Sequence, residues 1–225
     1  MQAHLMGTAS ANPSQIHLNR RYNTCIRRIF HARHLNWRSN IAYRIGAYTP
    51  LRDQKANLLI AHVRVILEDL ITDIEHVGST AVKNLPAKAK FHLDVILENA
   101  NHLDEAVSLL EAAGYTPLGF LYECDVFHLT RASRNVPEEN GACMLQPAHR
   151  VCLCFPNAVE PRRRAAFRDA LTADGNLRHE YEALKRRLIS KDNQDWDAYS
   201  AGKAQFSETV LRSLNRSDLC LGDSV

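Results

Sequence analysis

The stretch that most constrains this fold runs from Ile74 to Leu97, where two strand patterns flank a glycine-hydroxyl turn. Its first residues, Ile74 to Val77, are typical of the end of a β-strand, and Gly78 then allows the backbone to turn sharply. Ser79 and Thr80 follow at a predicted helix N-terminus, where free backbone N–H groups can bind an anion. The stretch therefore predicts a strand, a turn able to hold a phosphate group, and a second strand.

The second strand, Phe91 to Leu97, brings an imidazole and a carboxylate to one face. Because side chains alternate along a strand, His92, Asp94 and Ile96 point the same way. A carboxylate between apolar neighbours on an inner strand needs a partner or an ion, so Asp94 is a candidate site residue. The pattern leaves that partner open between a metal, Lys88 and an arginine.

These motifs resemble the GrpB family, a group placed in the nucleotidyltransferase superfamily. The resemblance rests on EHVGSTAVKNLPAK, followed closely by the acidic strand, and continues through FRDAL and YEALKRRL to near Asn215. It implies an α/β (α+β) fold, in which a small mixed sheet with nucleotidyltransferase-like topology is flanked by helices and closed by a helical C-terminal part. In that superfamily the Gly-Ser turn holds a nucleoside triphosphate, and paired carboxylates bind two divalent metal ions.

The metal-binding strand departs from the family pattern at one position. The family's Asp-x-Asp falls on His92-Leu93-Asp94, so the second carboxylate is kept and the first is replaced. The resemblance implies Mg²⁺ or Mn²⁺ as the cofactor, and magnesium requires oxygen ligands. Imidazole is a poor magnesium ligand, so His92 is expected to change which metal binds, to weaken metal binding or to abolish it. The alternative is a structural histidine that hydrogen-bonds a neighbouring hydroxyl.

The resemblance also assigns roles to residues outside the central stretch. His149 precedes a later strand that is expected to lie beside the strand of Asp94 and to face the same cleft, its alternative being a surface position. Arginines of the helix near residue 165 are expected to meet phosphates, or else to form a solvated helix face. The candidate catalytic residues are Asp94 and His92, the candidate metal ligands are Asp94 and His149, and the candidate nucleotide- or phosphate-binding residues are Gly78, Ser79, Thr80, Lys88, Arg163, Arg168 and Lys203.

Basic residues are unevenly distributed along the 225 residues, whose formal net charge is +3. Eight arginines and no acidic residue precede Asp53, whereas the rest has 20 basic against 25 acidic residues. Residues 1–40 are therefore predicted to be a disordered or targeting leader, with a mitochondrial presequence or a basic arm for nucleic acid as alternatives. The GrpB-like domain is expected over 41–215, and a frayed tail over 216–225.

Composition places the chain among ordinary globular proteins, with 45% apolar and 24% charged residues. No apolar run reaches the roughly 20 residues of a membrane-spanning helix, so a membrane partner is not expected. The six cysteines match no zinc pattern and favour reduced thiols in the cytoplasm. Hydrophobic periodicity predicts helices near 53–70, 103–110, 162–172, 177–188 and 196–214, strands near 124–130 and 150–155, and a surface loop over 132–146.

Two functions follow from these features. In the first, the chain binds a nucleotide or another phosphorylated small molecule, and transfers a nucleotidyl group if Asp94 holds a metal. In the second, the cleft belongs to a non-catalytic binding or accessory domain whose metal site is degenerate at His92. Nucleic acid, bound through the arginine-rich leader, is the least favoured partner.

Overall fold

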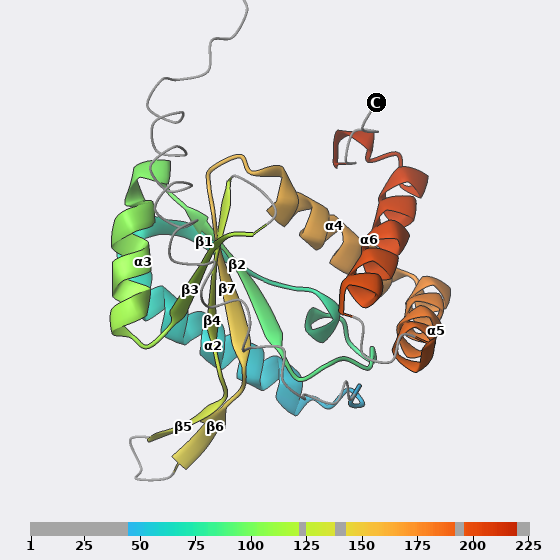
Figure 1. The fold of residues 1–225 in the computed structure, drawn as a ribbon, viewed down its shortest axis with the longest axis horizontal. Helices are drawn as coiled ribbons and strands as arrows, with labels where there is room; N and C mark the ends of the chain where they lie inside the picture. Colours follow the sequence, from blue (N-terminus) through green and yellow to red (C-terminus); the bar gives the residue numbers. More distant parts are fainter. Residues whose placement is uncertain (1–44, 122–124, 138–142, 192–195, 220–225) are drawn as a thin grey trace, which may run out of the picture. The chain divides into compact units, whose positions relative to one another are not determined.

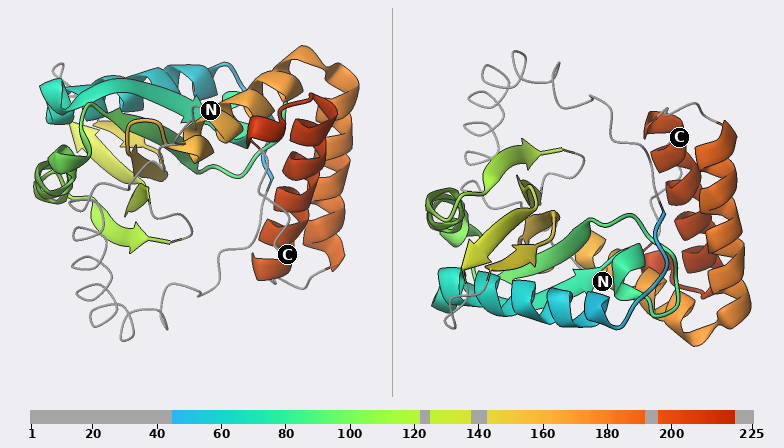
Figure 2. Two further views of the ribbon diagram at one scale, coloured as in Figure 1. Left: turned by 90° about the horizontal axis from the view of Figure 1, so that it is seen from above. Right: turned by 90° about the horizontal axis from the view of Figure 1, so that it is seen from below.

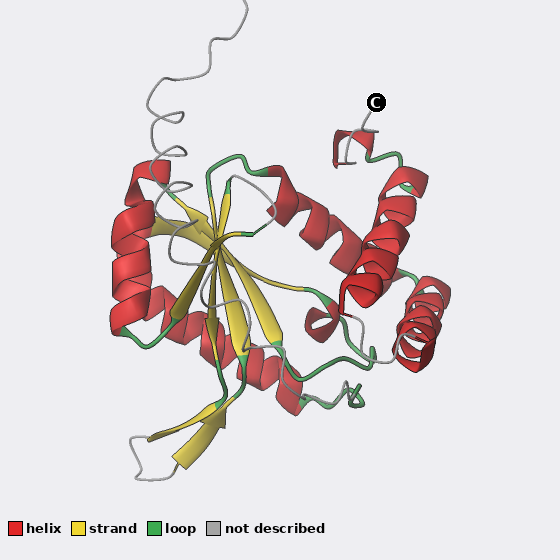
Figure 3. Cartoon of the chain, viewed as in Figure 1, coloured by secondary structure: helices red, strands yellow, loops and turns green. Residues whose placement is uncertain are grey.

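The computed structural model describes residues 45–121, 125–137, 143–191 and 196–219. The predicted leader over 1–40 lies outside these residues. Within them, a five-stranded mixed sheet has the strand order β1-β2-β7-β4-β3 (Figures 1 and 3). Its strands are β1 (Ile71–Val77), β2 (Phe91–Leu97), β3 (Thr116–Phe120), β4 (Val126–Arg131) and β7 (His149–Cys154).

The central strands β2 and β7 run parallel, and each neighbouring pair outside them is antiparallel. Buried apolar residues of one face, including Leu93, Val95, Val151 and Leu153, form much of the core. Helix α2 (Leu51–Leu67) contacts β1, and α3 (Leu103–Ala112) contacts both α2 and β3. The pattern predicted from alternating apolar residues in β2 is therefore realised with its apolar side facing the core.

Three helices form the C-terminal part: α4 (Val159–Ala173), α5 (Gly175–Lys191) and α6 (Trp196–Ser213). Helices α5 and α6 lie side by side, and α4 contacts both of them and β1 (Figure 2). The predicted fold, a mixed sheet flanked by helices with a helical C-terminal part, is confirmed. Within the described residues, none of the helices combines the length and the apolarity needed to cross a membrane.

Three local predictions were wrong. The helix expected to begin at Ser79 is only a single 3-10 turn, η2 (Ser79–Ala81). The surface loop predicted over 132–146 contains an antiparallel strand pair, β5 (Arg134–Pro137) and β6 (Cys143–Gln146). Residues 217–219, expected in a frayed tail, form the 3-10 turn η4 (Ser217–Leu219), whose last residue is buried.

An apolar cluster joins the segment after η2 to the C-terminal helices. Val82 and Leu85 pack with Leu171 of α4 and Tyr181 of α5, and Phe206 of α6 lies against the same cluster. This packing holds the turn-bearing segment close to α5 and α6, and it therefore positions the residues of the candidate site.

We predict that Leu85→Ala lowers the free energy of unfolding by about 2–5 kcal/mol, because Leu85 is fully buried and its truncation leaves a cavity. Urea denaturation measures the change. Leu58→Ala removes a leucine that is half exposed on α2, and is the matched control, with an expected loss below about 1 kcal/mol. Equal losses in the two variants would contradict the proposed role of the cluster.

Candidate functional site

Gly78 forms the turn between β1 and the segment that leads to β2. Its φ of +75° is in the region that favours glycine, and an added Cβ would lie 3.6 Å from Nδ1 of His92. The next two hydroxyls have different surroundings. Thr80 is buried and its Oγ1 lies 2.9 Å from Nε2 of His76, whereas the side chain of Ser79 hydrogen-bonds Tyr181 of α5. Ser79 therefore faces the helical part, and Thr80 fixes the turn.

A row of polar side chains crosses the sheet in register. Asp94 of β2 lies opposite Glu75 of β1 and Cys152 of β7, and Cys152 lies opposite His128 of β4. The Sγ of Cys152 is 3.3 Å from Nδ1 of His128. Two carboxylates are thus neighbours on adjacent strands, on the face opposite the apolar core residues of β2.

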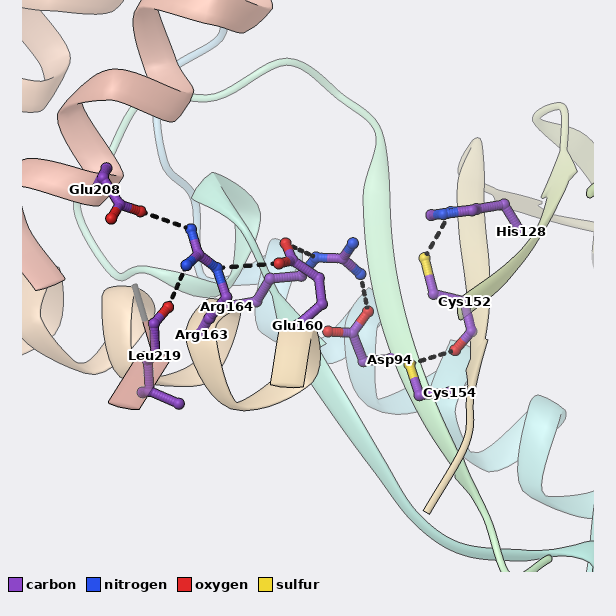
Figure 4. A network of polar contacts seen from close by, with 9 residues as sticks. All are labelled: Asp94, His128, Cys152, Cys154, Glu160, Arg163, Arg164, Glu208 and Leu219. Atoms are coloured by element: carbon purple, nitrogen blue, oxygen red, sulfur yellow. Dashed lines mark hydrogen bonds and ion pairs between the residues drawn. The ribbon is translucent and has the colours of Figure 1, made fainter. Parts of the chain in front are cut away.

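Asp94 is fully buried and is paired with an arginine of α4. Nη1 of Arg164 donates to Oδ1 of Asp94 at 2.8 Å, and its Nε donates to Glu160 at 3.1 Å (Figure 4). Burial raises the pKa of the Asp94 carboxyl, and the charge and hydrogen bond of Arg164 oppose that rise. Burial alone would lower the pKa of Arg164, but Asp94, Cys152 and Glu160 together outweigh it and raise the pKa above its ordinary value.

Arg168, one helical turn after Arg164, pairs with the neighbouring carboxylate. Its Nη1 forms an ion pair with Glu75 and also donates to the carbonyl of His76 at 3.0 Å. Arg163 has other partners: Glu160, Glu208 of α6 and the carbonyl of Leu219. Figure 4 shows Arg163 directed toward α6 and Arg164 toward the sheet. Of the two candidate phosphate-binding arginines, Arg163 and Arg168, only Arg168 thus contacts β1, the strand that precedes the Gly-Ser turn.

The donor set at Asp94 does not fit Mg²⁺, although the second oxygen of Asp94 has no hydrogen-bond partner in the described part of the chain. One oxygen of Asp94 is bound by Arg164, and the carboxylate opposite it, on Glu75, is bound by Arg168. Magnesium requires several oxygen ligands in an open octahedral arrangement, and the other predicted position on the strand holds an imidazole. In the described part of the chain, no three or more His, Cys, Asp or Glu side chains are grouped as metal ligands.

His149 does not join Asp94. In the β2–β7 register His149 lies opposite Phe91 and Asp94 lies opposite Cys152, so the two side chains point to opposite faces. The prediction that His149 faces the same cleft is therefore contradicted. His149 is buried, its Nδ1 donates to the carbonyl of Pro147 at 2.8 Å, and its Nε2 lies 2.8 Å from the hydroxyl of Tyr115. Burial lowers its pKa to about 4.

Two lysines from different segments meet at one aromatic ring. The Nζ atoms of Lys88, after η2, and Lys203, on α6, lie 3.9 Å and 4.9 Å from the ring centre of Tyr199. Burial lowers the pKa of both ammonium groups to about 8. The charge of Lys203 lowers the pKa of Lys88 further, and the charge of Arg150 lowers that of Lys203 further. The structure therefore brings together the two lysines that the resemblance singled out.

A third lysine, missed from the sequence, lies on α5 beside this pair. Lys185 is 1% exposed, its Nζ donates to the carbonyl of Pro86, and the Nζ lies 5.0 Å from the ring centre of Tyr181. Burial, and next the charge of Lys203, lower its pKa to about 7. Its position four residues after Tyr181, on the same face of α5, was the available signal in the sequence.

His92 is surrounded by positive charge. Burial first, and then Arg150, Lys90, Lys203 and Arg164, lower its pKa well below the ordinary value. The imidazole is therefore neutral at physiological pH. We call Lys88, Lys185, Lys203 and Arg150 together the basic cluster.

Comparison with known proteins gives a consistent result. The family model described as GrpB protein matches residues 43–213. The glutamate-rich protein GrpB of Alkalihalophilus pseudofirmus is 27% identical over 173 residues, which cover 73% of this chain and 88% of that protein. The UPF0157 protein YqkA of Bacillus subtilis is 25% identical over 154 residues, which cover 68% of this chain but only 42% of that longer protein.

Among solved structures, the conserved protein GrpB from Enterococcus faecalis matches with a TM-score of 0.63 at 23% identity. That match covers 76% of this chain and 99% of the other, and it supports the fold. A crystal structure of the Cid1 poly(U) polymerase with Mg 3'-dATP bound matches at 10% identity, with a TM-score of 0.47, over 83% of this chain and 53% of the other.

We predict that Arg164→Gln destabilises the protein by about 3–5 kcal/mol at neutral pH, because it leaves the buried Asp94 carboxylate without its cation. The loss should shrink as the pH falls, since burial raises the folded-state pKa of Asp94 and protonation then removes the uncompensated charge. Urea denaturation at several pH values measures both effects.

The double variant Asp94→Asn/Arg164→Gln should recover much of this loss, because neither charge is then buried alone. Arg162→Gln alters an exposed arginine of the same helix and should change stability by less than about 0.5 kcal/mol. A single Arg164 variant as stable as wild type at neutral pH would refute the central role of the pair.

Proposed function

The chain belongs to the GrpB protein family. We propose that it binds a nucleoside triphosphate or another phosphorylated small molecule at the basic cluster, without a divalent metal. The ligand lies between the Gly-Ser turn, the segment carrying Lys88, and helices α5 and α6. The single observation that carries the proposal is the convergence of Lys88 and Lys203 on the ring of Tyr199.

Burial of the lysines, and next the repulsion from neighbouring cations, support an anionic ligand. Holding several ammonium groups near one another, partly removed from water, disfavours their charged forms, and their lowered pKa values express this cost. An anion placed among them reverses the effect, because each charge then gains an opposite neighbour. Binding free energy is therefore greatest for a ligand that carries several negative charges.

The distribution of the cations favours a polyphosphate over a single phosphate group. Lys88 comes from the segment after η2, Lys185 from α5 and Lys203 from α6, so that the positive groups belong to three separate elements. Lysine is a compact charge with three rotatable donors, suited to phosphate oxygens of varied geometry. A chain of phosphates can contact several such groups at once.

The pairing of Asp94 with Arg164 favours binding without nucleotidyl transfer. In a two-metal mechanism, carboxylates must hold the ions that stabilise the attacking oxygen and the leaving pyrophosphate. Here the carboxylates of Asp94 and Glu75 are engaged by Arg164 and Arg168. Of the two functions considered from the sequence, the non-catalytic binding domain is therefore the one we propose.

The test is calorimetric titration with ATP, GTP, CTP and UTP, each with Mg²⁺ and with a chelator. We predict binding that persists in the chelator and weakens at least about tenfold in Lys203→Gln and in Lys88→Gln, since each variant removes a charged contact to phosphate. Lys83→Gln, an exposed lysine of the same segment as Lys88, is the matched control and should bind like wild type.

Two outcomes would refute this function. One is the absence of binding for all four triphosphates. The other is binding that requires Mg²⁺ and disappears in Asp94→Asn, which would indicate a metal-nucleotide site at β2 in place of a metal-free one.

We also predict that triphosphate affinity falls as the pH rises from about 7 to about 9. Lys88 and Lys203 have pKa values near 8 in the free protein, so they are charged below that range and neutral above it. A bound anion favours the charged forms, and binding near pH 8 must therefore take up protons. Titrations in buffers of different ionisation enthalpy measure this uptake; affinity independent of pH in wild type would contradict the assignment.

A further inference from the structure

A second group of cations lies near Gly114, which follows α3, on the face of the sheet opposite Asp94 and Arg150. Its members are Arg131 at the end of β4, Arg134 at the start of β5, and His62 on α2. Arg131 lies opposite His149 in the β4–β7 register, so its side chain points to the face opposite that of Asp94. The phosphate site proposed above does not use any of these residues.

Arg131 is 4% exposed, and two of its three nitrogens, which carry three of its five N–H groups, have no acceptor at hydrogen-bond distance in the described part of the chain. Its Nη1 lies 3.1 Å from Nε2 of His62, and its guanidinium carbon lies 4.8 Å from the ring centre of Tyr115. Its Nε and Nη2 are buried and have no acceptor at hydrogen-bond distance within the described residues, although the Tyr115 hydroxyl also acts on the guanidinium as an acceptor. These two N–H groups lie on the same edge of the guanidinium, the edge that binds a carboxylate or phosphate through two parallel hydrogen bonds.

This edge faces Gly114, which ends α3. A Cβ added to Gly114 would lie 3.5 Å from Nη2 of Arg131, 3.9 Å from its Nε and 3.7 Å from Nη1 of Arg134. Donors of two arginines thus converge on one point, and glycine brings no side-chain atom to it. Arg134 itself is exposed.

Capping of α3 does not explain the buried donors. Three carbonyls of the last helical turn already accept backbone hydrogen bonds: Leu109 from Ala113, Leu110 from Tyr115 and Glu111 from Gly114. Leaving two guanidinium donors of a buried arginine unbonded costs free energy. A ligand that accepts from both would remove that cost.

The local electrostatics are positive throughout. Burial first, and then Arg131 and Arg134, lower the pKa of His62. Burial also lowers the pKa of Arg131, and the nearby groups that act on it are Tyr115 and Arg134, with no carboxylate among them. This arrangement is the opposite of the Asp94 region, where each arginine has its own acid.

We propose that Arg131, Arg134 and His62 form a second anion-binding site, which takes a carboxylate or phosphate group through the Nε/Nη2 edge of Arg131. The oxyanion lies over Gly114, between the two guanidinium groups. The site is separate from the triphosphate site and does not depend on it.

NMR titration of the full-length ¹⁵N-labelled protein tests this site at about neutral pH. Inorganic phosphate and acetate are the probes, with chloride at matched ionic strength as the reference. The Nε–H resonance of Arg131, assigned by its loss in Arg131→Lys, reports the proposed contact directly. We expect a saturable shift of this resonance with phosphate, with acetate or with both, and the probe that binds more tightly identifies the class of oxyanion.

In Arg134→Gln the affinity should fall at least about tenfold, because one charged partner is removed from an exposed position that does not affect folding. Arg64→Gln, a half-exposed arginine on α2 that pairs with Asp73, should leave the affinity unchanged. The shift should also persist in Lys88→Gln/Lys203→Gln, which separates it from binding at the basic cluster. Shifts no larger than those with chloride, shifts unaffected by Arg134→Gln, or shifts lost in the double lysine variant would each overturn the proposal.

Discussion

The ion pair between Asp94 and Arg164 is the interaction on which the arrangement of this protein depends. Asp94 is fully buried on an inner strand, and a buried charge without a partner is strongly destabilising. Together with the pair between Arg168 and Glu75, it attaches α4 to β1 and β2. Because α5 and α6 pack on α4, these two contacts also set where Lys185 and Lys203 stand relative to the Gly-Ser turn.

The central stretch was largely predictable because its signals are local. Alternation fixed the faces of β2, and the need of Asp94 for a partner was evident from its apolar neighbours. Which residue is the partner could not be predicted, because Arg164 is 70 residues away from Asp94 in the chain. Arg162, Arg163, Arg164 and Arg168 have similar local sequence, and only the rotation of α4 against the sheet decides that Arg164 meets Asp94 while Arg163 meets Glu208.

The errors concern strand faces and solvent exposure. His149 alternates with Val151 and Leu153, which pair with the core-facing residues of β2, so it lies on the face opposite Asp94. The expectation for His149 followed its position in the family pattern and did not use this alternation. The β5–β6 pair lacks the alternating apolar residues that mark a strand on a core. Lys185 was overlooked because lysines on a helix are usually solvated, whereas this one is buried beneath the segment containing Pro86.

The proposed function depends on how the negative charge of a polyphosphate is compensated. A polyphosphate needs compensating positive charge, which divalent ions supply in a two-metal mechanism and which lysines supply in the proposed site. Lysines and divalent metal ions are not equivalent in catalysis. Lysines fixed around a bound triphosphate stabilise it without holding an attacking oxygen, and only interactions stronger in the transition state than in the bound state accelerate a reaction. Because Asp94 and Glu75 are paired with arginines, we expect the proposed site to bind phosphates without transferring them.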